Sequence, residues 1–312
     1  MKALLHACTC VVAGILAGCG QFQPQPETYD RTSSWVSPQA QSEDLLYVSD
    51  QLFSEVYVLS YPAGKPAGML TGFNYPEGLC TDSRGDVFVT DLLARKIVEY
   101  AHAGSKPKRV LNDSKNPQGC SVNPLTGDLA VVDYGSSGTP GDVAVYPKAR
   151  GSPTDYDDPT MISFQSCAYD GSGNLFADGQ KYANEPGLVE LPAGARKLKD
   201  IRLNHGFNAS GSVQWDGQHL AVMGNAAQSI YRLTISGLSA KIVGRTKLIS
   251  PKYPLAFWIE KNSLLLTYLP PHSKQTALGV WAYPSGGRPV RVRHLVGIYG
   301  VTVSSCSATC SR

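Results

Sequence analysis

The sequence predicts an all-β protein in which one four-stranded unit is repeated six times. From Asp44 onward the chain divides into six units of about 42 to 46 residues, and each unit carries apolar strands in the same order. Turns rich in glycine and proline recur at one phase of that period. No amphipathic helical pattern of about ten residues or more is present in these units.

The six units cover residues 44–85, 86–127, 128–173, 174–217, 218–263 and 264–306. Each opens with a short apolar strand: "DLLYVSD", "DVFVTD", "DLAVVD", "NLFADG", "HLAVMGN" and "LLLTYL". Another apolar strand comes next in each unit: "EVYVLSYP", "KIVEYA", "DVAVYP", "GLVELP", "SIYRLTI" and "LGVWAYP". A turn such as "PSGGRP" then leads to a more polar strand such as "VRVRHLV". The last strands are "EGLCTD", "QGCSVN", "QSCAYD", "GSVQWD", "LAFWIE" and "YGVTVS". This order and period are typical of propeller blades, so we expect a six-bladed β-propeller.

The two ends of the repeat region complete one another. The first unit begins with a strand of the kind that follows an inner strand, and the last strand of the chain, at 299–305, lacks a following partner. We therefore expect a propeller closed by the C-terminal strand, which joins the first blade formed by residues 44–72. Closure of this kind removes the unpaired edges that an open stack of sheets would expose.

One motif of the repeat resembles a known family. "NYPEGLCTDSRGDVFVTD" (74–91) and "NPQGCSVNPLTGDLAVVD" (116–133) share the pattern Pro-x-Gly, an apolar strand, a turn with glycine, and a strand that ends in Asp. The pattern resembles the NHL-repeat type of six-bladed β-propeller over residues 44–306, most closely in the first three units. Later units depart from it: Asn225 and Leu269 replace the strand-end Asp, and Ala209-Ser210-Gly211 or Pro254-Leu255 replaces Pro-x-Gly.

The first residues, "MKALLHACTCVVAGILAGCG", combine an early lysine, an apolar stretch and small residues, which is the layout of a secretory signal. Residues 16–19, Leu-Ala-Gly-Cys, resemble a bacterial lipobox. We therefore expect residues 1–18 to be a lipoprotein signal peptide and Cys19 to be lipidated, so that a lipid anchor attaches the exported protein to a membrane. By the same resemblance, Gly20 favours the outer membrane if the organism is Gram-negative.

The domain organisation follows from composition. Residues 19–43 comprise the lipidated cysteine and a linker rich in Gln, Pro and Ser without apolar periodicity. Such a flexible linker spans on the order of 25 Å. Residues 44–306 form the propeller, and residues 307–312 form a C-terminal tail.

The charge of the chain limits the class of partner. Only 17% of its 312 residues are charged and the formal net charge is +3, too little for the basic footprint of a nucleic-acid-binding protein. We expect a monomeric body with no cofactor, acting as a binding or scaffolding module for a protein or glycan partner.

Repeated aspartates invite two interpretations. The strand-end residues could form a ring of metal ligands, but one acid in each blade favours capping of the following loop by hydrogen bonds to backbone amides. These strand-end residues are Asp50, Asp91, Asp133 and Asp178. A second set, which precedes glycine-containing turns and is interpreted as turn residues, comprises Asp82, Asn123, Asp170 and Asp216.

A better functional candidate is the position just before the glycine of the inner strand or its equivalent. If the blades are arranged as expected, these side chains converge on one mouth of the axial channel, as a ligand ring or simply as solvated groups. They are Glu77, Gln118, Gln165, Ser210, Pro254 and Tyr299. Glu77 is the only acid among them, which suits a cation or a polar ligand.

The alternative function is a propeller hydrolase or lyase with a site near Glu77. Lactonases of the gluconolactonase-like family hold a divalent metal with Glu, Asn and Asp, whereas Glu77 is accompanied by Gln118 and Gln165, whose amides are weaker ligands. The histidines fall at unrelated phases of the repeat. We therefore assign no catalytic and no metal-binding residue.

The mature chain would hold five cysteines besides Cys19, so at least one lacks an intramolecular partner. Cys306 and Cys310 are candidates for a disulfide, because an exported tail meets an oxidising compartment. Cys120 and Cys167 occupy equivalent places on successive inner strands, where we expect small buried thiols rather than a bridge. The arginines of "RPVRVRH", 288–294, could form a basic patch, but we favour the protection of an outer strand from edge pairing.

Overall fold

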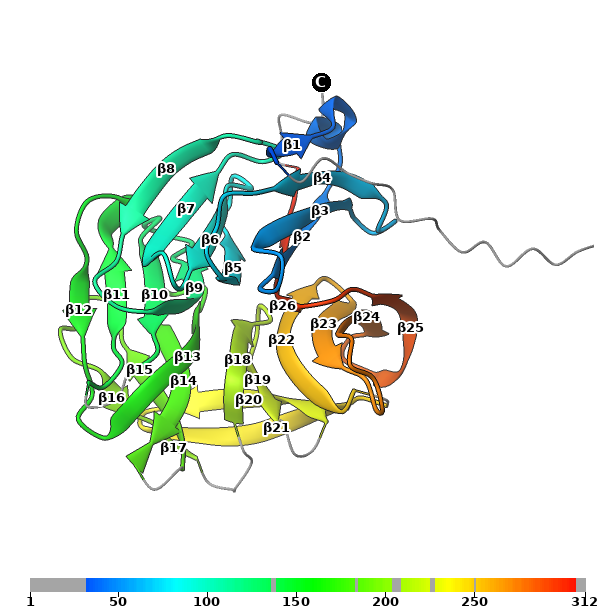
Figure 1. Cartoon of the computed structure of the whole chain (residues 1–312). Helices are drawn as coiled ribbons and strands as arrows, with labels where there is room; N and C mark the ends of the chain where they lie inside the picture. Colours follow the sequence, from blue (N-terminus) through cyan, green and yellow to red (C-terminus); the bar gives the residue numbers. More distant parts are fainter. Residues whose placement is uncertain are drawn as a thin grey trace, which may run out of the picture. The chain divides into compact units, whose positions relative to one another are not determined.

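The computed structural model describes residues 32–306 except 136–138, 183–184, 204–208, 225–227 and 250. These residues form six antiparallel β-sheets arranged as the blades of a ring (Figure 1). The described residues contain no α-helix, only two short 3-10 turns, η1 (Pro38–Ser42) and η2 (Pro147–Ala149). The prediction of an all-β, six-bladed propeller is confirmed.

Each blade has four main strands. In order from blade 1 to blade 6, the inner strands are β26 (Ile298–Ser304), β5 (Pro76–Thr81), β9 (Pro117–Val122), β13 (Met161–Tyr169), β18 (Ala209–Trp215) and β22 (Tyr253–Glu260). The second strands are β2 (Leu45–Asp50), β6 (Val87–Asp91), β10 (Leu129–Asp133), β14 (Leu175–Lys181), β19 (Leu220–Gly224) and β23 (Ser263–Leu269). The third strands are β3 (Glu55–Ser60), β7 (Lys96–Tyr100), β11 (Val143–Tyr146), β15 (Pro186–Leu191), β20 (Ser229–Ser236) and β24 (Ala277–Ala282).

The outer strands, in the same order, are β4 (Pro66–Leu70), β8 (Pro107–Asn112), β12 (Thr154–Tyr156), β16 (Lys199–Asp200), β21 (Ser239–Lys247) and β25 (Gly286–His294). Two short strands extend this pattern: β1 (Trp35–Val36) beside β4, and β17 (Arg202–Leu203) beside β21. Trp35 and Val36 lie in the segment that the sequence analysis assigns to the linker. Gly68 permits this fifth strand, since a Cβ there would stand 2.6 Å from the carbonyl oxygen of Trp35.

The ring closes as the sequence predicts. β26 pairs antiparallel with β2, with Leu45 opposite Ser304 and Val48 opposite Val301. Each inner strand also contacts the next around the ring, including β22 with β26 and β26 with β5. The last strand of the chain is therefore the inner strand of the first blade.

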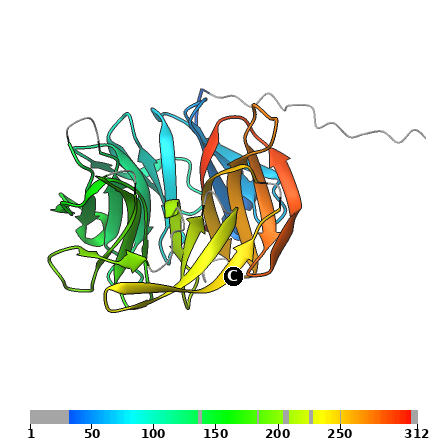
Figure 2. The same cartoon turned by 90° about the horizontal axis from the view of Figure 1, so that it is seen from below.

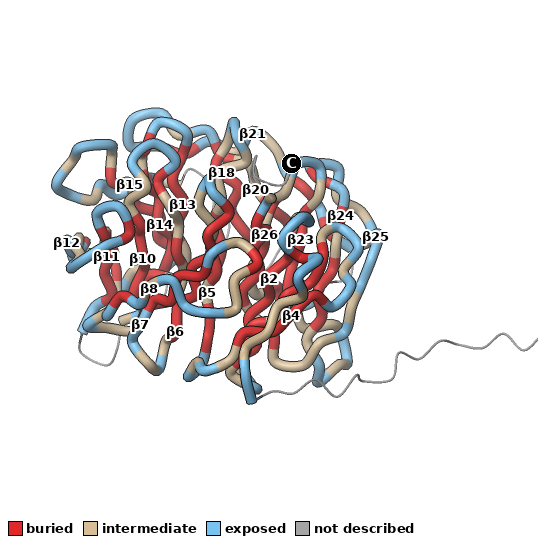
Figure 3. The backbone as a smooth tube through the Cα atoms, turned by 90° about the horizontal axis from the view of Figure 1, so that it is seen from above, coloured by how far each residue is buried: buried red, intermediate tan, exposed pale blue. Residues whose placement is uncertain are grey.

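The pairing registers define two faces of the ring, seen edge-on in Figure 2. Inner strands begin beside the ends of second strands, as Pro76 opposite Asp91 and Tyr253 opposite Leu269 show. We call this side the start face, and the opposite side, where inner strands end, the end face. The strands are buried along most of their length, and the turns at both faces are exposed (Figure 3).

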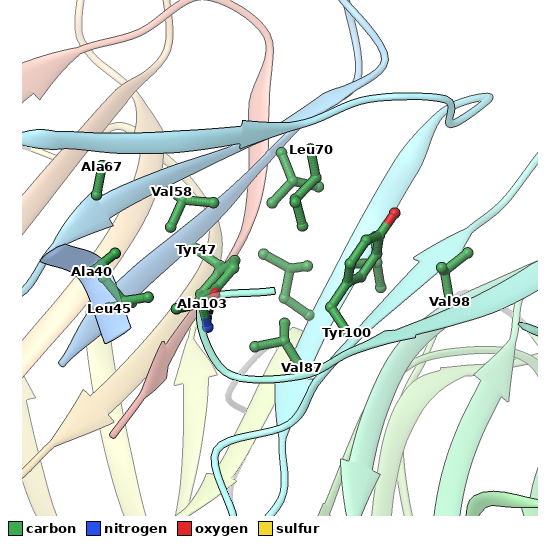
Figure 4. Packing of buried hydrophobic residues seen from close by; sticks show 13 residues of the cluster. Ala40, Leu45, Tyr47, Val58, Ala67, Leu70, Val87, Val98, Tyr100 and Ala103 are labelled. Carbon is green, nitrogen blue, oxygen red and sulfur yellow. Dashed lines mark hydrogen bonds between the residues drawn. The ribbon is translucent and has the colours of Figure 1, made fainter. Parts of the chain in front are cut away.

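The core lies between neighbouring blades. Between blades 1 and 2, buried side chains from both sheets, among them Tyr47, Leu70, Val87 and Tyr100, form one cluster (Figure 4). Phe73, in the loop from β4 to β5, packs on Tyr100 with ring centroids 6.2 Å apart. Burial of such side chains contributes about 1.5–3 kcal/mol each.

The Pro-x-Gly motif has a steric cause at the centre of the ring. A Cβ on Gly78 would lie 2.1 Å from the carbonyl oxygen of Gln118, and one on Gly300 would lie 2.1 Å from that of Glu77. A Cβ on Gly119 would lie 2.7 Å from the Cα of Ser166. Adjacent inner strands therefore approach so closely that these positions tolerate only glycine.

Hydroxyl groups on second strands join the blades at the same level. Ser49 Oγ accepts a hydrogen bond from the amide of Gly300 (2.7 Å) and donates to the carbonyl of Glu77 (2.6 Å). Thr90 does the same between the amide of Gly78 (2.8 Å) and the carbonyl of Gln118 (2.5 Å). Thr267 binds the amide of Ala256 and the carbonyl of Tyr299. The backbone carbonyls of three candidate ring residues, Glu77, Gln118 and Tyr299, are thus held in place.

Most of the repeated aspartates bind backbone amides, whereas Asp133 differs from the prediction: its Oδ1 has no hydrogen-bond partner among the described residues, and its side chain contacts that of Asp142. Asp50 caps its own loop by accepting from the amides of Leu52 and Phe53, both at 2.9 Å. Asp91 accepts from the amide of Asn74, in the loop before the inner strand, and also has a backbone hydrogen bond with Ala94 in its own loop. The predicted turn residues all accept amide hydrogen bonds within their own turns: Asp82, Asn123, Asp170 and Asp216.

The cysteines differ in part from expectation. Cys80 and Cys120 form a disulfide between blades 2 and 3, with Cα atoms 5.7 Å apart, whereas Cys167 is free and buried. The glycine contact between β5 and β9 brings the two backbones within bridging distance, although Cys80 lies one residue beyond the position equivalent to Cys120. Cys306 is disulfide-bonded. Cys310 lies outside the described residues, so the Cys306–Cys310 pairing stays a prediction.

The arginines of the outermost strand β25 reach the neighbouring blade. Arg291 donates to the carbonyl of Pro62, and Arg293 donates to the carbonyl of Gly64. Both acceptors belong to the β3–β4 turn of blade 1. These side chains therefore join the last blade to the first across the site of ring closure, in addition to the predicted protection of an outer strand.

Candidate functional site

An axial cavity of about 460 Å³ runs along the inner strands. Three of the candidate ring residues, Gln118, Gln165 and Tyr299, line it at the level where the inner strands begin. The lining extends to Pro124, Gly171 and Gly217, which lie in turns that follow inner strands at the end face. The side chain of Ser210 lies outside the described residues.

Two tryptophans supply aromatic surface to the same cavity. Trp215 and Trp258 come from the neighbouring inner strands β18 and β22, and both are half-buried. Trp258 Nε1 donates to Glu260 Oε2 at 3.4 Å, which fixes one edge of its indole ring. Sequence reasoning missed these residues, although the strands "GSVQWD" and "LAFWIE" place a tryptophan five residues after Ser210 and four residues after Pro254, respectively.

Glu77 is set apart from the other ring residues. Its side chain is 5% exposed and does not line the cavity. The Gln118 amide nitrogen donates to Glu77 Oε1 at 3.4 Å, while Oε2 has no hydrogen-bond partner among the described residues. Burial raises the pKa of Glu77 to about 7, against smaller opposite effects of hydrogen bonds from Gln51 and Gln118. Glu77 therefore acts on the cavity through Gln118.

Asp178 is a second buried acid near the start of the inner strands. Its Oδ2 accepts from the amide of Gly211 at 3.0 Å, and Gly211 lines the cavity. Burial raises the pKa of Asp178 to about 7. Burial first, and then the charges of Glu77 and Asp178, raise the pKa of the Tyr299 phenol. Tyr299 therefore keeps its proton and can donate a hydrogen bond.

The polar side chains that line the cavity where the inner strands begin are uncharged, and the one acid of the lining, Asp170 at the end face, is hydrogen-bonded within its own turn. No hydrogen bond from the described residues engages the side-chain amide of Gln165 or the hydroxyl of Tyr299, and Gln118 has only its contact with Glu77. Together they offer donors and acceptors without a fixed charge. Such a set, with two indole surfaces further along, suits a neutral ligand rich in hydroxyl groups.

A further group of acids lies between blades 2 and 3. Lys115 forms an ion pair with the buried Asp142. Asp133 is 1% exposed, and burial, followed by the nearby Asp113 and Asp142, raises its pKa to about 9. Within the described ranges no three His, Cys, Asp or Glu side chains are placed to hold a metal ion, and no described histidine lines the cavity.

Comparison with known proteins supports the fold. A search of protein-family models and a search of curated proteins each find no match. Among solved structures, the chain is similar to a propeller in "Crystal structure of Nidogen/Laminin Complex" at 14% identity and a TM-score of 0.67, over 84% of this chain and 99% of that one. A Bacteroides caccae protein of unknown function is similar at 12% identity and a TM-score of 0.61, over 84% and 99% of the two chains.

A third similar structure is a streptogramin B lyase, at 14% identity and a TM-score of 0.57, over 88% of this chain and 90% of that one. The structural similarity shows a shared β-propeller fold, and at sequence identities this low it shows nothing beyond the fold. The fold itself serves unrelated functions, so any role has to be argued from the residues of the cavity.

Proposed function

We propose that this chain is a lipid-anchored cell-envelope binding module, an NHL-type propeller whose axial cavity takes part of a protein or glycan partner. The observation that carries the proposal is the cavity of about 460 Å³, within the range of small-ligand sites, which Gln118, Gln165, Tyr299 and two tryptophans line. Neutral amides and a phenol pair with sugar hydroxyls, and indole faces pack against sugar rings. The cavity thus favours the glycan over the protein.

The glycan ligand is tested with the full-length protein and neutral oligosaccharides such as chitotriose, cellotriose and maltotriose, by calorimetric titration. We expect saturable binding that Gln165→Ala and Trp215→Ala each weaken by about tenfold, since a lost polar or stacking contact costs on the order of 1–2 kcal/mol. Leu125→Ala, at an exposed position of the β9–β10 turn, is the matched control. Absence of saturable binding at concentrations on the order of 1 mM, or equal binding by all variants, would contradict it.

The partner of the binding module could instead be a protein. The similar propeller of the nidogen/laminin structure supports it only as an example of this fold within a protein complex. Crosslinking in intact cells, followed by mass spectrometry, would identify a protein that contacts the ring. Crosslinks that survive in Gln165→Ala and Trp215→Ala would place such a partner outside the cavity.

Catalysis of a hydrolase or lyase type is a second candidate. A carboxyl with a pKa of about 7 is suited to proton transfer near neutral pH, and Glu77 has this property beside the cavity. Its burial and its position outside the cavity lining weigh against direct contact with a substrate. Loss of a measured hydrolase or lyase activity in Glu77→Gln, with substrate binding retained, would favour this candidate.

The anchor is proposed from the residues around Cys19 and from the signal-like segment before it. In the described part of the chain, no helix has the length and apolar character that a membrane crossing requires. Mass spectrometry of the N-terminal peptide should show a diacylglyceryl group on Cys19, and Cys19→Ala should move the protein out of the membrane fraction. Outer-membrane localisation, the expectation for a Gram-negative organism, is checked by density-gradient fractionation of the two membranes.

A further inference from the structure

Half of the 14 exposed large apolar side chains of the described residues lie at one face of the ring, and five others lie on or just after outer strands at its rim. Seven exposed residues stand in turns or strand ends at the start face: Leu52, Phe53, Tyr75, Leu93, Tyr134, Tyr182 and Tyr253. The end-face turns that join consecutive strands within a blade carry two, Leu125 and Leu238. Single exposed apolar residues are ordinary, but a concentration on one face marks an interaction surface.

These side chains belong to five of the six blades. Leu52 and Phe53 form the β2–β3 turn of blade 1, Leu93 belongs to the β6–β7 turn of blade 2, and Tyr253 begins β22 of blade 6. Leu52 is 62% exposed and Leu93 is 57% exposed. They stand at the tips of turns around the cavity rather than in one groove. A broad, roughly flat partner fits this arrangement better than a peptide or a single helix.

The chain enters the described body at the same face. Ser34 Oγ accepts from the amide of Thr71 at 2.8 Å, and Thr71 is the first residue of the loop that leads to the start of β5. β1 then runs antiparallel to β4, away from the start face. In Figure 2, where the ring is seen from the side, the blue N-terminal segment reaches one of its two faces.

The tether between this point and the proposed lipid is short. Twelve residues separate Cys19 from Thr32. A flexible chain of that length has an average span of about 20 Å and a maximum of about 45 Å. A body of this size has a radius of gyration of about 19 Å, so a tether leaving the start face holds that face nearer to the lipid than the end face.

The exposed charges of the start face are compatible with an anionic surface. Basic side chains in its turns and loops are Arg95, Lys96, Lys252 and Lys274, and exposed acids there are Asp157 and Glu185. The basic residues lie in blades 2 and 6, on either side of the blade at which the chain enters. Basic residues are also exposed elsewhere on the ring, so it is the apolar turns that distinguish this face.

We infer that the start face of the propeller lies against the lipid surface to which the chain is anchored, with its exposed aromatic and leucine side chains in the headgroup region. Tyrosine suits that region because it combines an apolar ring with a hydroxyl group that can stay hydrated, and four of the seven side chains are tyrosines. The cavity then opens to the aqueous side through the end face, past Pro124, Gly171 and Gly217. This inference rests on the proposed lipidation of Cys19.

The test uses the full-length lipidated protein reconstituted in vesicles of phosphatidylethanolamine and phosphatidylglycerol, with or without a doxyl-labelled quencher lipid. Leu52→Trp and Leu93→Trp place a reporter on the start face, and Leu125→Trp places a matched reporter on the end face. After subtraction of the parent protein's fluorescence, we expect quenching of the two start-face reporters at least about twofold stronger than that of Leu125→Trp. All three sites are exposed, and thermal unfolding equal to that of the parent confirms that each variant folds.

The experiment distinguishes a wrong orientation of the propeller from a missing lipid anchor. If the protein floats with the vesicles and carries lipid on Cys19, but the three reporters are quenched equally or Leu125→Trp is quenched most, the orientation is wrong while the anchor stands. If the protein neither floats nor carries lipid, the anchor fails and the inference fails with it.

Discussion

Glu77 occupies a position at which the backbone has the same role in several blades, while the side chain differs from blade to blade. The carbonyl oxygens of Glu77, Gln118 and Tyr299 all accept hydrogen bonds from hydroxyl groups of the preceding blade. The backbone role is thus common to an acid, an amide and a phenol. Only the side chains can account for selectivity toward a ligand.

The acid at this position should lower stability at neutral pH. Burial raises the pKa of Glu77 from 4.5 to about 7, so between these values the folded protein holds a proton that the unfolded chain has released. Stability therefore falls as the pH rises through this window and levels off above about 7. Glu77→Gln should increase the free energy of unfolding at pH 8 by on the order of 2 kcal/mol and leave it unchanged at pH 4.

Urea unfolding of the parent and of Glu77→Gln across pH 4–8 measures this effect. Glu185→Gln, which removes an exposed acid, should leave the pH dependence as it is in the parent. An equal loss of stability by Glu77→Gln at both ends of the range would mean that the carboxylate supports the fold.

At the level of elements, the inner strands are held by contacts that leave no room for a side chain. A methyl group on Gly78 would lie 2.1 Å from the carbonyl oxygen of Gln118. Hydrogen bonds with Thr90 restrain the backbone of both residues. Relief would require the two blades to separate. The disulfide between Cys80 and Cys120 further restrains this pair of strands.

Gly78→Ala should therefore destabilise the propeller by about 3 kcal/mol or more, as strain in a packed site does. Gly171→Ala is the control, because a Cβ there would have nothing within 4 Å and the backbone is not in the left-handed region. We expect the control to change stability by less than about 1 kcal/mol. Thermal unfolding distinguishes them, and similar melting temperatures for the two variants would show that adjacent blades can move apart freely.

The sequence was sufficient for the strands and for their closure into a ring, because alternation and turn residues recur in each unit. It was insufficient where contacts cross between blades. The Cys80–Cys120 bridge joins residues at unequal positions of the repeat, and the pairing of β1 with β4 depends on the space beside Gly68. The position of Glu77 behind Gln118 is likewise a property of packing, which periodicity alone does not report.

At the level of the whole molecule, the ring depends on a strand from the far end of the chain. β26 supplies Tyr299 to the cavity, buries Ile298 and Val301 between blades 1 and 6, and hydrogen-bonds to blade 1 over its length. Without it, β2 would have an unpaired edge facing the axis, and both β5 and β22 would lose a neighbour.

Truncation after Gly297 should therefore give a protein that fails to close and aggregates, because unpaired strand edges recruit other chains. Size-exclusion chromatography and circular dichroism measure both effects. Truncation after Cys306 is the control, since it keeps β26 complete and removes only the predicted tail. A monomeric, cooperatively unfolding product from the shorter chain would show that blade 1 can lack its inner strand while the other five blades stay complete, and that ring closure contributes little to stability.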